Sequence, residues 1–189
     1  MKLPTTASQT VGPYLHIGLT WLNTPNLVGS GVTAAAITIN GRLVDGDAVP
    51  VSDALVEVWQ ANEHGRYAHP QDTRDLPLTP GFAGFGRMPT DAEGRFAFTT
   101  IKPGRVPAAA GGLQAPHIGV MLLMRGMLRH LHTRMYFADE ASANADDALL
   151  QALPEARRAT LVAGVGERRG EYTWEVVLQG PRETVFLDV

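Results

Sequence analysis

The sequence predicts an all-β fold, an antiparallel β-sandwich with one short helical segment and an irregular N-terminal arm. Short runs such as ALVEVWQAN at 54–62 and GRFAFTTI at 94–101 alternate between two faces of different polarity, which is the pattern of a half-buried strand. Turn dipeptides separate the runs, at Asp45-Gly46, His64-Gly65, Glu93-Gly94, Pro103-Gly104 and Arg169-Gly170. Short strands joined by turns are typical of a sandwich or barrel.

The elements follow in chain order. Residues 1–16 are polar, contain Pro and Gly, and predict an irregular arm, and 17–31 are loop-like. Strands are then predicted at 35–46, 54–62, 94–101, 117–125, 128–137, 172–180 and 183–189. The run HIGVMLLMR at 117–125 is continuously apolar, which indicates a strand buried on both faces. Residues 142–162 are rich in Ala and Leu and predict the helical segment, interrupted by Pro154.

The composition fits one globular domain over residues 1–189. Hydrophobic residues make up 44% and charged residues 19%, and the net charge of −3 gives no basic surface for nucleic acid. The chain contains no cysteine, which excludes disulfides, thiolate metal sites and cysteine nucleophiles. We expect a cytoplasmic protein, since the first residues lack the apolar core of a signal peptide and no run reaches the ~18 apolar residues of a membrane span.

Several side chains are of types that hold metals or anions. Tyr67 follows a turn, His117 heads the apolar run, and His130 and His132 are spaced to share one face of a strand. Each has an ordinary structural interpretation, because a metal site needs three or four ligands and none of these groups supplies them locally. Arg125 and Arg134 end or interrupt apolar strands, where an arginine can bind a carboxylate through two hydrogen bonds or lie in solvent. These residues alone leave the alternatives open.

Longer segments carry a family resemblance. The matching text includes SQTVGPYLHIG at 8–18, GRLVDGDAVPVSDALVEVWQANEHGRY at 41–67, GFGRMPTDAEGRFAFTTIKPG at 84–104, APHIGVMLLMRGMLRHLHTRMYFADE at 115–140 and QGPRETVFLDV at 179–189. Together these segments span most of the chain and resemble the intradiol ring-cleaving dioxygenases. The resemblance implies the sandwich fold of that family, over one domain, with residues 1–16 as an arm that reaches toward a partner subunit's cleft.

The resemblance also implies a hetero-oligomer of two homologous chains that have different roles. In such a pair the beta chain holds a non-haem Fe(III) with two tyrosines and two histidines. Tyr67 and His117 occupy two of these ligand positions here, but Val106 and Gly119 stand at the other two. We therefore expect no metal and no catalytic residue in this chain alone, and Fe(III) in the partner beta subunit.

The same resemblance implies a substrate role for the arm. The substrates would be O2 and protocatechuate, a dihydroxybenzoate whose carboxylate lies far from its hydroxyls. Thr10, Gly12, Pro13 and Tyr14 would shape the wall of the shared pocket, with Tyr14 near the carboxylate. Arg125 is the first choice for the positive charge that this carboxylate needs, and Arg134 is the second.

Two other interpretations remain. A stand-alone dioxygenase would need a substitute ligand such as His69, His130 or His132. A transthyretin-like or Cna-B-like sandwich would serve only for binding or structure, although the N-terminal SQTVGPYLHIG and the C-terminal PRETVFLDV have no evident use in a plain binding sandwich.

Overall fold

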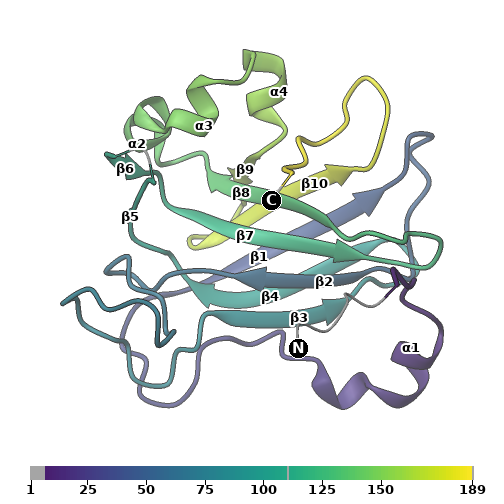
Figure 1. Ribbon diagram of the computed structural model, residues 1–189, viewed down its shortest axis with the longest axis horizontal. Helices are drawn as coiled ribbons and strands as arrows, with labels where there is room; N and C mark the ends of the chain where they lie inside the picture. Colours follow the sequence, from purple (N-terminus) through teal and green to yellow (C-terminus); the bar gives the residue numbers. More distant parts are fainter. Residues whose placement is uncertain (1–6, 110, 189) are drawn as a thin grey trace, which may run out of the picture.

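A computed structural model describes residues 7–109 and 111–188. Its strands are β1 Ala36–Val44, β2 Leu55–Trp59, β3 Phe85–Pro89, β4 Arg95–Ile101, β5 Val106–Pro107, β6 Leu113–Gln114, β7 His117–Leu123, β8 Leu131–Phe137, β9 Val162–Val165 and β10 Glu171–Val177. Its helices are α1 Tyr14–Gly18, the 3₁₀ turn η1 Thr20–Leu22, α2 Ala141–Asp146, α3 Ala148–Gln151 and α4 Glu155–Ala159. In Figure 1, α1 and the α2–α4 group lie at opposite ends of the molecule.

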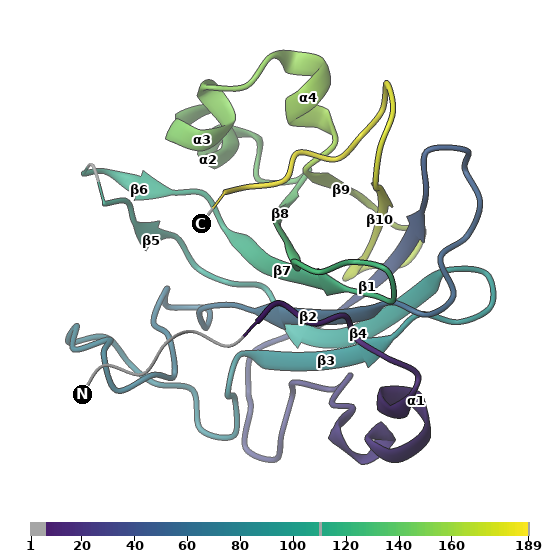
Figure 2. The same cartoon turned by 45° about the vertical axis from the view of Figure 1, so that its right-hand side comes forward.

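Eight strands form one sheet in the order β3-β2-β7-β8-β9-β10-β1-β4, and β5 and β6 pair separately. The sheet curls round until its two end strands, β3 and β4, approach each other, as Figure 2 shows. The predicted all-β fold with little helix is thus confirmed. Two neighbouring pairs, β1 with β10 and β8 with β9, are parallel, which the predicted antiparallel sandwich did not include.

The inner faces of the sheet enclose the main core. Ile39, Leu43, Ile118 and Leu122 are wholly buried there, because strand residues two apart point to the same face. The prediction that residues 117–125 are buried on both faces is wrong: in β7, buried residues alternate with the half-buried Gly119, Met121 and Leu123. One side of this strand is therefore open enough to form part of a site.

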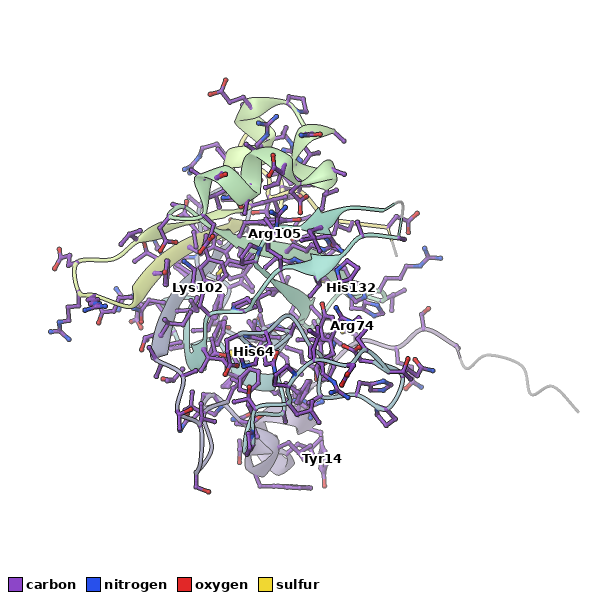
Figure 3. All side chains as sticks on the ribbon, turned by 90° about the vertical axis from the view of Figure 1, so that its left-hand side faces the viewer. Tyr14, His64, Arg74, Lys102, Arg105 and His132 are labelled. Atoms are coloured by element: carbon purple, nitrogen blue, oxygen red, sulfur yellow. The ribbon has the colours of Figure 1, made fainter. Side chains whose placement is uncertain are left out.

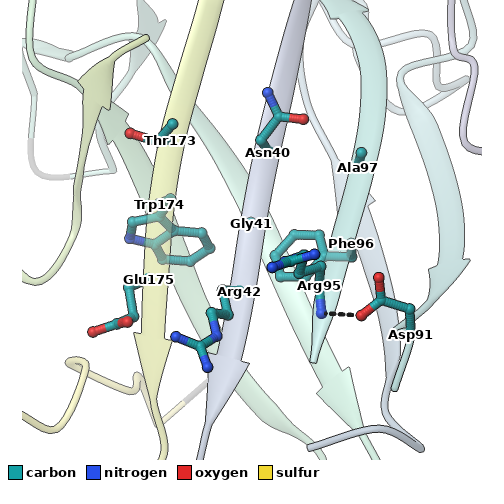
Figure 4. A pocket seen from close by; sticks show the side chains of 10 residues that line it. All are labelled: Asn40, Gly41, Arg42, Asp91, Arg95, Phe96, Ala97, Thr173, Trp174 and Glu175. Atoms are coloured by element: carbon teal, nitrogen blue, oxygen red, sulfur yellow. Dashed lines mark hydrogen bonds between the residues drawn. The ribbon is translucent and has the colours of Figure 1, made fainter. Parts of the chain in front are cut away.

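Gly41 is required by the packing of two aromatic side chains. It pairs with Trp174 of β10 on one side and with Phe96 of β4 on the other, and Figure 4 shows the two rings flanking it. A Cβ added at Gly41 would lie 2.1 Å from Cζ of Phe96. The absent side chain leaves the space that the Phe96 ring fills.

The predicted helical segment at 142–162 is three short helices followed by a strand. Asp147 breaks the run between α2 and α3, and its carboxylate accepts hydrogen bonds from the backbone N–H groups of Leu149 and Leu150. Pro154 then precedes α4, where its fixed φ suits a helix start. The segment ends before the expected boundary, because Val162 already belongs to β9.

The termini also differ from expectation. The predicted irregular arm at 1–16 contains the start of α1 at Tyr14, while residues 1–6 lie outside the described part of the chain. The predicted strand at 183–189 is reduced to a bridge between Leu187 and His132. Within residues 7–109 and 111–188, no helix is long and apolar enough to cross a membrane.

Candidate functional site

The family resemblance assigns metal-ligand positions to four residues, Tyr67, Val106, His117 and Gly119, and these are called here the relict site. Tyr67 follows β2, Val106 lies on β5, and His117 and Gly119 lie on the same face of β7. Trp59 of β2 connects three of them: it pairs with Gly119 across the sheet, stacks on the ring of Tyr67 with centroids 5.8 Å apart, and lines a cavity of about 690 Å³ together with Tyr67 and Val106. The fold therefore gathers positions that are 52 residues apart in sequence, from 67 to 119.

His117 is buried and held in one tautomer. Its Nδ1–H donates to the backbone carbonyl of Ala115 at 2.8 Å, which leaves Nε2 as the acceptor nitrogen. Burial, together with the positive charge of Arg134, lowers the pKa of His117 to about 4. The imidazole is therefore neutral near pH 7.

Tyr67 is held by an ion pair at the back of its loop. Its backbone N–H donates to Asp72 Oδ2 at 2.8 Å, and Arg74 binds the same carboxylate through Nε and Nη2 at 2.8 and 2.6 Å. This pairing with Arg74 holds the pKa of Asp72 well below its usual range. Gly65, at φ +77°, lets the turn pass against the carbonyl of Arg105. Burial raises the pKa of the Tyr67 phenol, so it stays protonated at neutral pH.

Arg134 of β8 lies beside the relict site. It pairs with Gly119 across the sheet, and its guanidinium donates to Oε1 of Gln114. Its positive charge opposes the rise in the pKa of Tyr67 and adds to the fall in that of His117. Behind it, burial raises the pKa of Tyr136 to about 12, and the Tyr136 hydroxyl donates to the buried Asp147 at 3.4 Å.

The residues at the relict site do not fit Fe(III). Val106 and Gly119 supply no donor atom, and the cationic Arg134 stands next to Gly119. Ferric iron prefers anionic oxygen ligands and is repelled by a neighbouring positive charge. Across the part of the chain that the structure describes, no three His, Cys, Asp or Glu side chains gather in a way that could hold a metal ion.

The predicted substrate-binding residues lie elsewhere. Thr10 Oγ1 donates to the carbonyl of Met124, just beyond the end of β7 that is farther from His117. Arg125 follows directly, and its Nε pairs with Asp53 at 2.7 Å while its side chain stays 77% exposed. The structure thus brings Thr10 and Arg125 to one end of β7. Arg134, the second choice, lies at the other end with the relict site.

The rest of the arm is half-buried at Gly12 and exposed from Pro13 to Tyr14. Gly12 and Pro13 lead into α1, and their carbonyls accept from the N–H groups of Leu15 and Ile17. The Tyr14 ring lies along Gly18 and remains 72% exposed. Figure 3 shows Tyr14 at the outer end of the molecule, well separated from Arg74 and His132.

Some residues of the site carried no clear sequence signal. Trp59 reads as one alternating strand residue among several, and Gln114 sits in a loop-like stretch before Pro116. Asp72 and Arg74 look like ordinary surface charges in a polar loop. Their roles depend on contacts that only the folded chain makes.

The comparisons with known proteins decide the family. A family model described as Dioxygenase matches residues 22–180. The chain belongs to the intradiol ring-cleaving dioxygenase family. It is 43% identical to the protocatechuate 3,4-dioxygenase alpha chain of Burkholderia cepacia, over 99% of this chain and 98% of that one. The beta chain from the same organism is 40% identical, over 76% of this chain and 64% of that one.

A solved structure supports the same family. The dioxygenase domain of a dioxygenase carbohydrate-binding protein fusion from Streptomyces sp. SirexAA-E aligns with a TM-score of 0.62 and 27% identity, covering 86% of this chain and 89% of that one. The resemblance inferred from the sequence is thus confirmed. Family membership also counts against the transthyretin-like and Cna-B-like alternative, since the long matched segments belong to a dioxygenase.

Proposed function

We propose that this chain is the alpha subunit of a protocatechuate 3,4-dioxygenase and works with a homologous beta subunit that carries Fe(III). The complex would cleave protocatechuate between its two hydroxylated carbons and insert both atoms of O2. The product would be 3-carboxy-cis,cis-muconate. The similarity to an alpha chain over nearly the whole length of both proteins supports this assignment.

The observation that carries the proposal is the composition of the relict site. The chain keeps the family's fold and two of the four ligand positions, but Val106 and Gly119 replace the others and Arg134 stands beside the gap. A chain with this site contributes to a dioxygenase by supporting a partner's iron centre. The similarity to a beta chain indicates what kind of partner that is.

Within the complex, we assign the arm to the partner's substrate pocket. Tyr14 would hydrogen-bond near the substrate carboxylate, with Thr10, Gly12 and Pro13 forming the pocket wall. Arg125 would supply the positive charge, because it lies at the same end of β7 as Thr10. Arg134 is less suited to this role, since it lies at the relict site of its own chain.

The exposed surface of α1 and η1 fits a partner contact. Ile17 is 77% exposed and Trp21 is 75% exposed, next to the exposed Tyr14. Large apolar side chains gathered at one place on a surface are a common mark of a protein interface. We infer that this surface, continuous with the arm, meets the beta subunit.

No observation favours a stand-alone enzyme. His130 and His132 pack edge to face with ring centroids 4.6 Å apart, and His69 packs against Trp59 at 6.4 Å. Within the described residues, none of these histidines belongs to a group of three His, Cys, Asp or Glu side chains that could hold a metal ion.

The test is to purify this chain alone and co-expressed with a beta chain, and to measure iron content and protocatechuate cleavage. The chain alone should contain no stoichiometric iron and show no cleavage, while the complex should contain one iron per pair and be active. The control is the beta chain expressed alone under the same conditions. Stoichiometric iron together with cleavage by the lone alpha chain would overturn the proposal.

A further inference from the structure

The outer face of β3, β2, β7 and β8 places four residues in one row. Trp59 pairs with Phe85 on one side and with Gly119 on the other, and Gly119 pairs with Arg134. Residues paired across neighbouring strands point to the same face of a sheet. The row therefore runs from two aromatic rings, across a residue without a side chain, to a guanidinium.

The space above Gly119 is open. A Cβ added there would meet only the carbonyl oxygen of Trp59, at 3.3 Å. A cavity of about 350 Å³ lies at this place, and Met121 and His132 also line it. Trp59 and Phe85 are 38% and 39% exposed, which is unusual for two large rings side by side. The walls can therefore contact an apolar ligand.

The charge at this cavity is positive. Among the described residues no carboxylate lies within ion-pair distance of Arg134. Its side chain bonds to neutral partners, the Gln114 amide and the Tyr136 hydroxyl. The acidic residue at the cavity, Glu57, already accepts a hydrogen bond from Nε of Arg87 at 2.6 Å. His132 has its pKa lowered by burial and by the neighbouring His130, and adds no positive charge at neutral pH. Arg134 thus remains available to an anion.

We propose that this cavity binds a single-ring aromatic carboxylate, with the carboxylate on Arg134 and the ring between Gly119 and the side chains of Trp59 and Phe85. A guanidinium holds a carboxylate with two parallel hydrogen bonds, and offset stacking on Trp and Phe favours a flat ring over an inorganic anion. The cavity volume lies at the small end of the range for ligand pockets. The site would bind its ligand without converting it chemically. This inference does not depend on the proposed beta partner or on protocatechuate as the substrate.

The probe is 4-fluorobenzoate, titrated against the purified full-length chain after chelator treatment and followed by ¹⁹F NMR. We expect saturable binding at one site per chain. Arg134→Gln should weaken binding of the probe at least tenfold, because the charged guanidinium is lost. Gly119→Leu should abolish binding, because the leucine side chain fills the cavity. Arg42→Gln, a strand arginine on the exposed face of β1, is the matched control and should bind like wild type.

Competition separates the possible ligand classes. Inorganic phosphate at the same concentration should not displace the probe, and uncharged 4-fluorotoluene should bind at least tenfold more weakly. Absence of saturable binding, equal displacement by phosphate, or wild-type binding by a folded Arg134→Gln variant would each overturn the proposal. Thermal unfolding of each variant verifies that it is folded, and the competition arms use the wild-type chain alone. If the probe does not bind, the expected iron content and the expected activity of the co-expressed complex do not change.

Discussion

His117 remains buried although Val106 and Gly119 supply no metal ligands. A histidine binds a metal in its neutral form, and burial and the charge of Arg134 favour the same neutral form of His117 here. Asp147 supports the surrounding backbone, since its carboxylate accepts the N–H of Ala115 at 2.8 Å as well as capping α3. His117 has thus become part of the packing of the fold.

The free energy of unfolding should depend on pH through His117. Its pKa in the folded chain, about 4, is below the value of 6.5 for the unfolded chain, so the unfolded state binds more protons between these values. The stabilisation that depends on a neutral His117 is complete above pH 6.5 and is lost as the pH falls toward 4. The wild-type chain should lose about 3 kcal/mol more than His117→Gln between pH 7 and pH 4. Urea unfolding of both proteins at several pH values measures this, and identical pH slopes would contradict it.

At the scale of elements, β1 depends on the close approach of β4. Gly41 lies between Trp174 and Phe96, and the ring of Phe96 occupies the space of the missing side chain. Phe96 and Trp174 are both buried, so moving either ring disturbs the side chains packed against it. The pairing of three strands is therefore tied to one glycine.

Gly41→Ala should lower the free energy of unfolding by about 3 kcal/mol, because the added methyl forces the Phe96 ring out of place. Gly164→Ala in β9 is the control: its Cβ would meet only Thr173 Oγ1, at 3.7 Å, and stability should change by less than about 0.5 kcal/mol. Urea denaturation measures both variants. Equal effects of the two substitutions would show that Phe96 has room to adjust.

At the scale of the whole molecule, the two ends of β7 have separate roles. The relict site with Arg134 lies at one end, and the contact between Thr10 and Met124 lies at the other, next to Arg125. The arm and the exposed residues of α1 and η1 continue from that second end. The proposed substrate-binding residues Thr10 and Arg125 therefore lie apart from the relict site.

In the co-expressed complex, Arg125→Gln should raise KM for protocatechuate about tenfold, because a charge-assisted hydrogen bond to the substrate carboxylate is lost. KM for catechol, which lacks the carboxylate, should stay the same. Arg129→Gln, an exposed arginine of the same hairpin, is the control and should change neither value. Steady-state kinetics with both substrates measures the effect. An equal rise for both substrates would indicate a structural role for Arg125.

Residue identity and local pattern were enough to predict the family and the all-β fold. Long matched segments identified the family, and strand alternation in 54–62 and 94–101 identified buried faces. The loss of donors at Val106 and Gly119 follows from residue identity alone, since neither side chain can bind a metal whatever surrounds it. These conclusions needed local pattern and composition.

The separation of Arg125 from Arg134, and the position of Trp59 beside Tyr67 and Gly119, follow from the folding of the whole sheet. Alternation tells which face a strand residue occupies, but the neighbour across the sheet comes from a distant part of the chain. The two parallel strand pairs and the break at Asp147 were decided in the same way, by partners beyond the local sequence. The sequence of a strand specifies which residues lie on each face, while the packing of the whole sheet specifies which residues of other strands lie next to them.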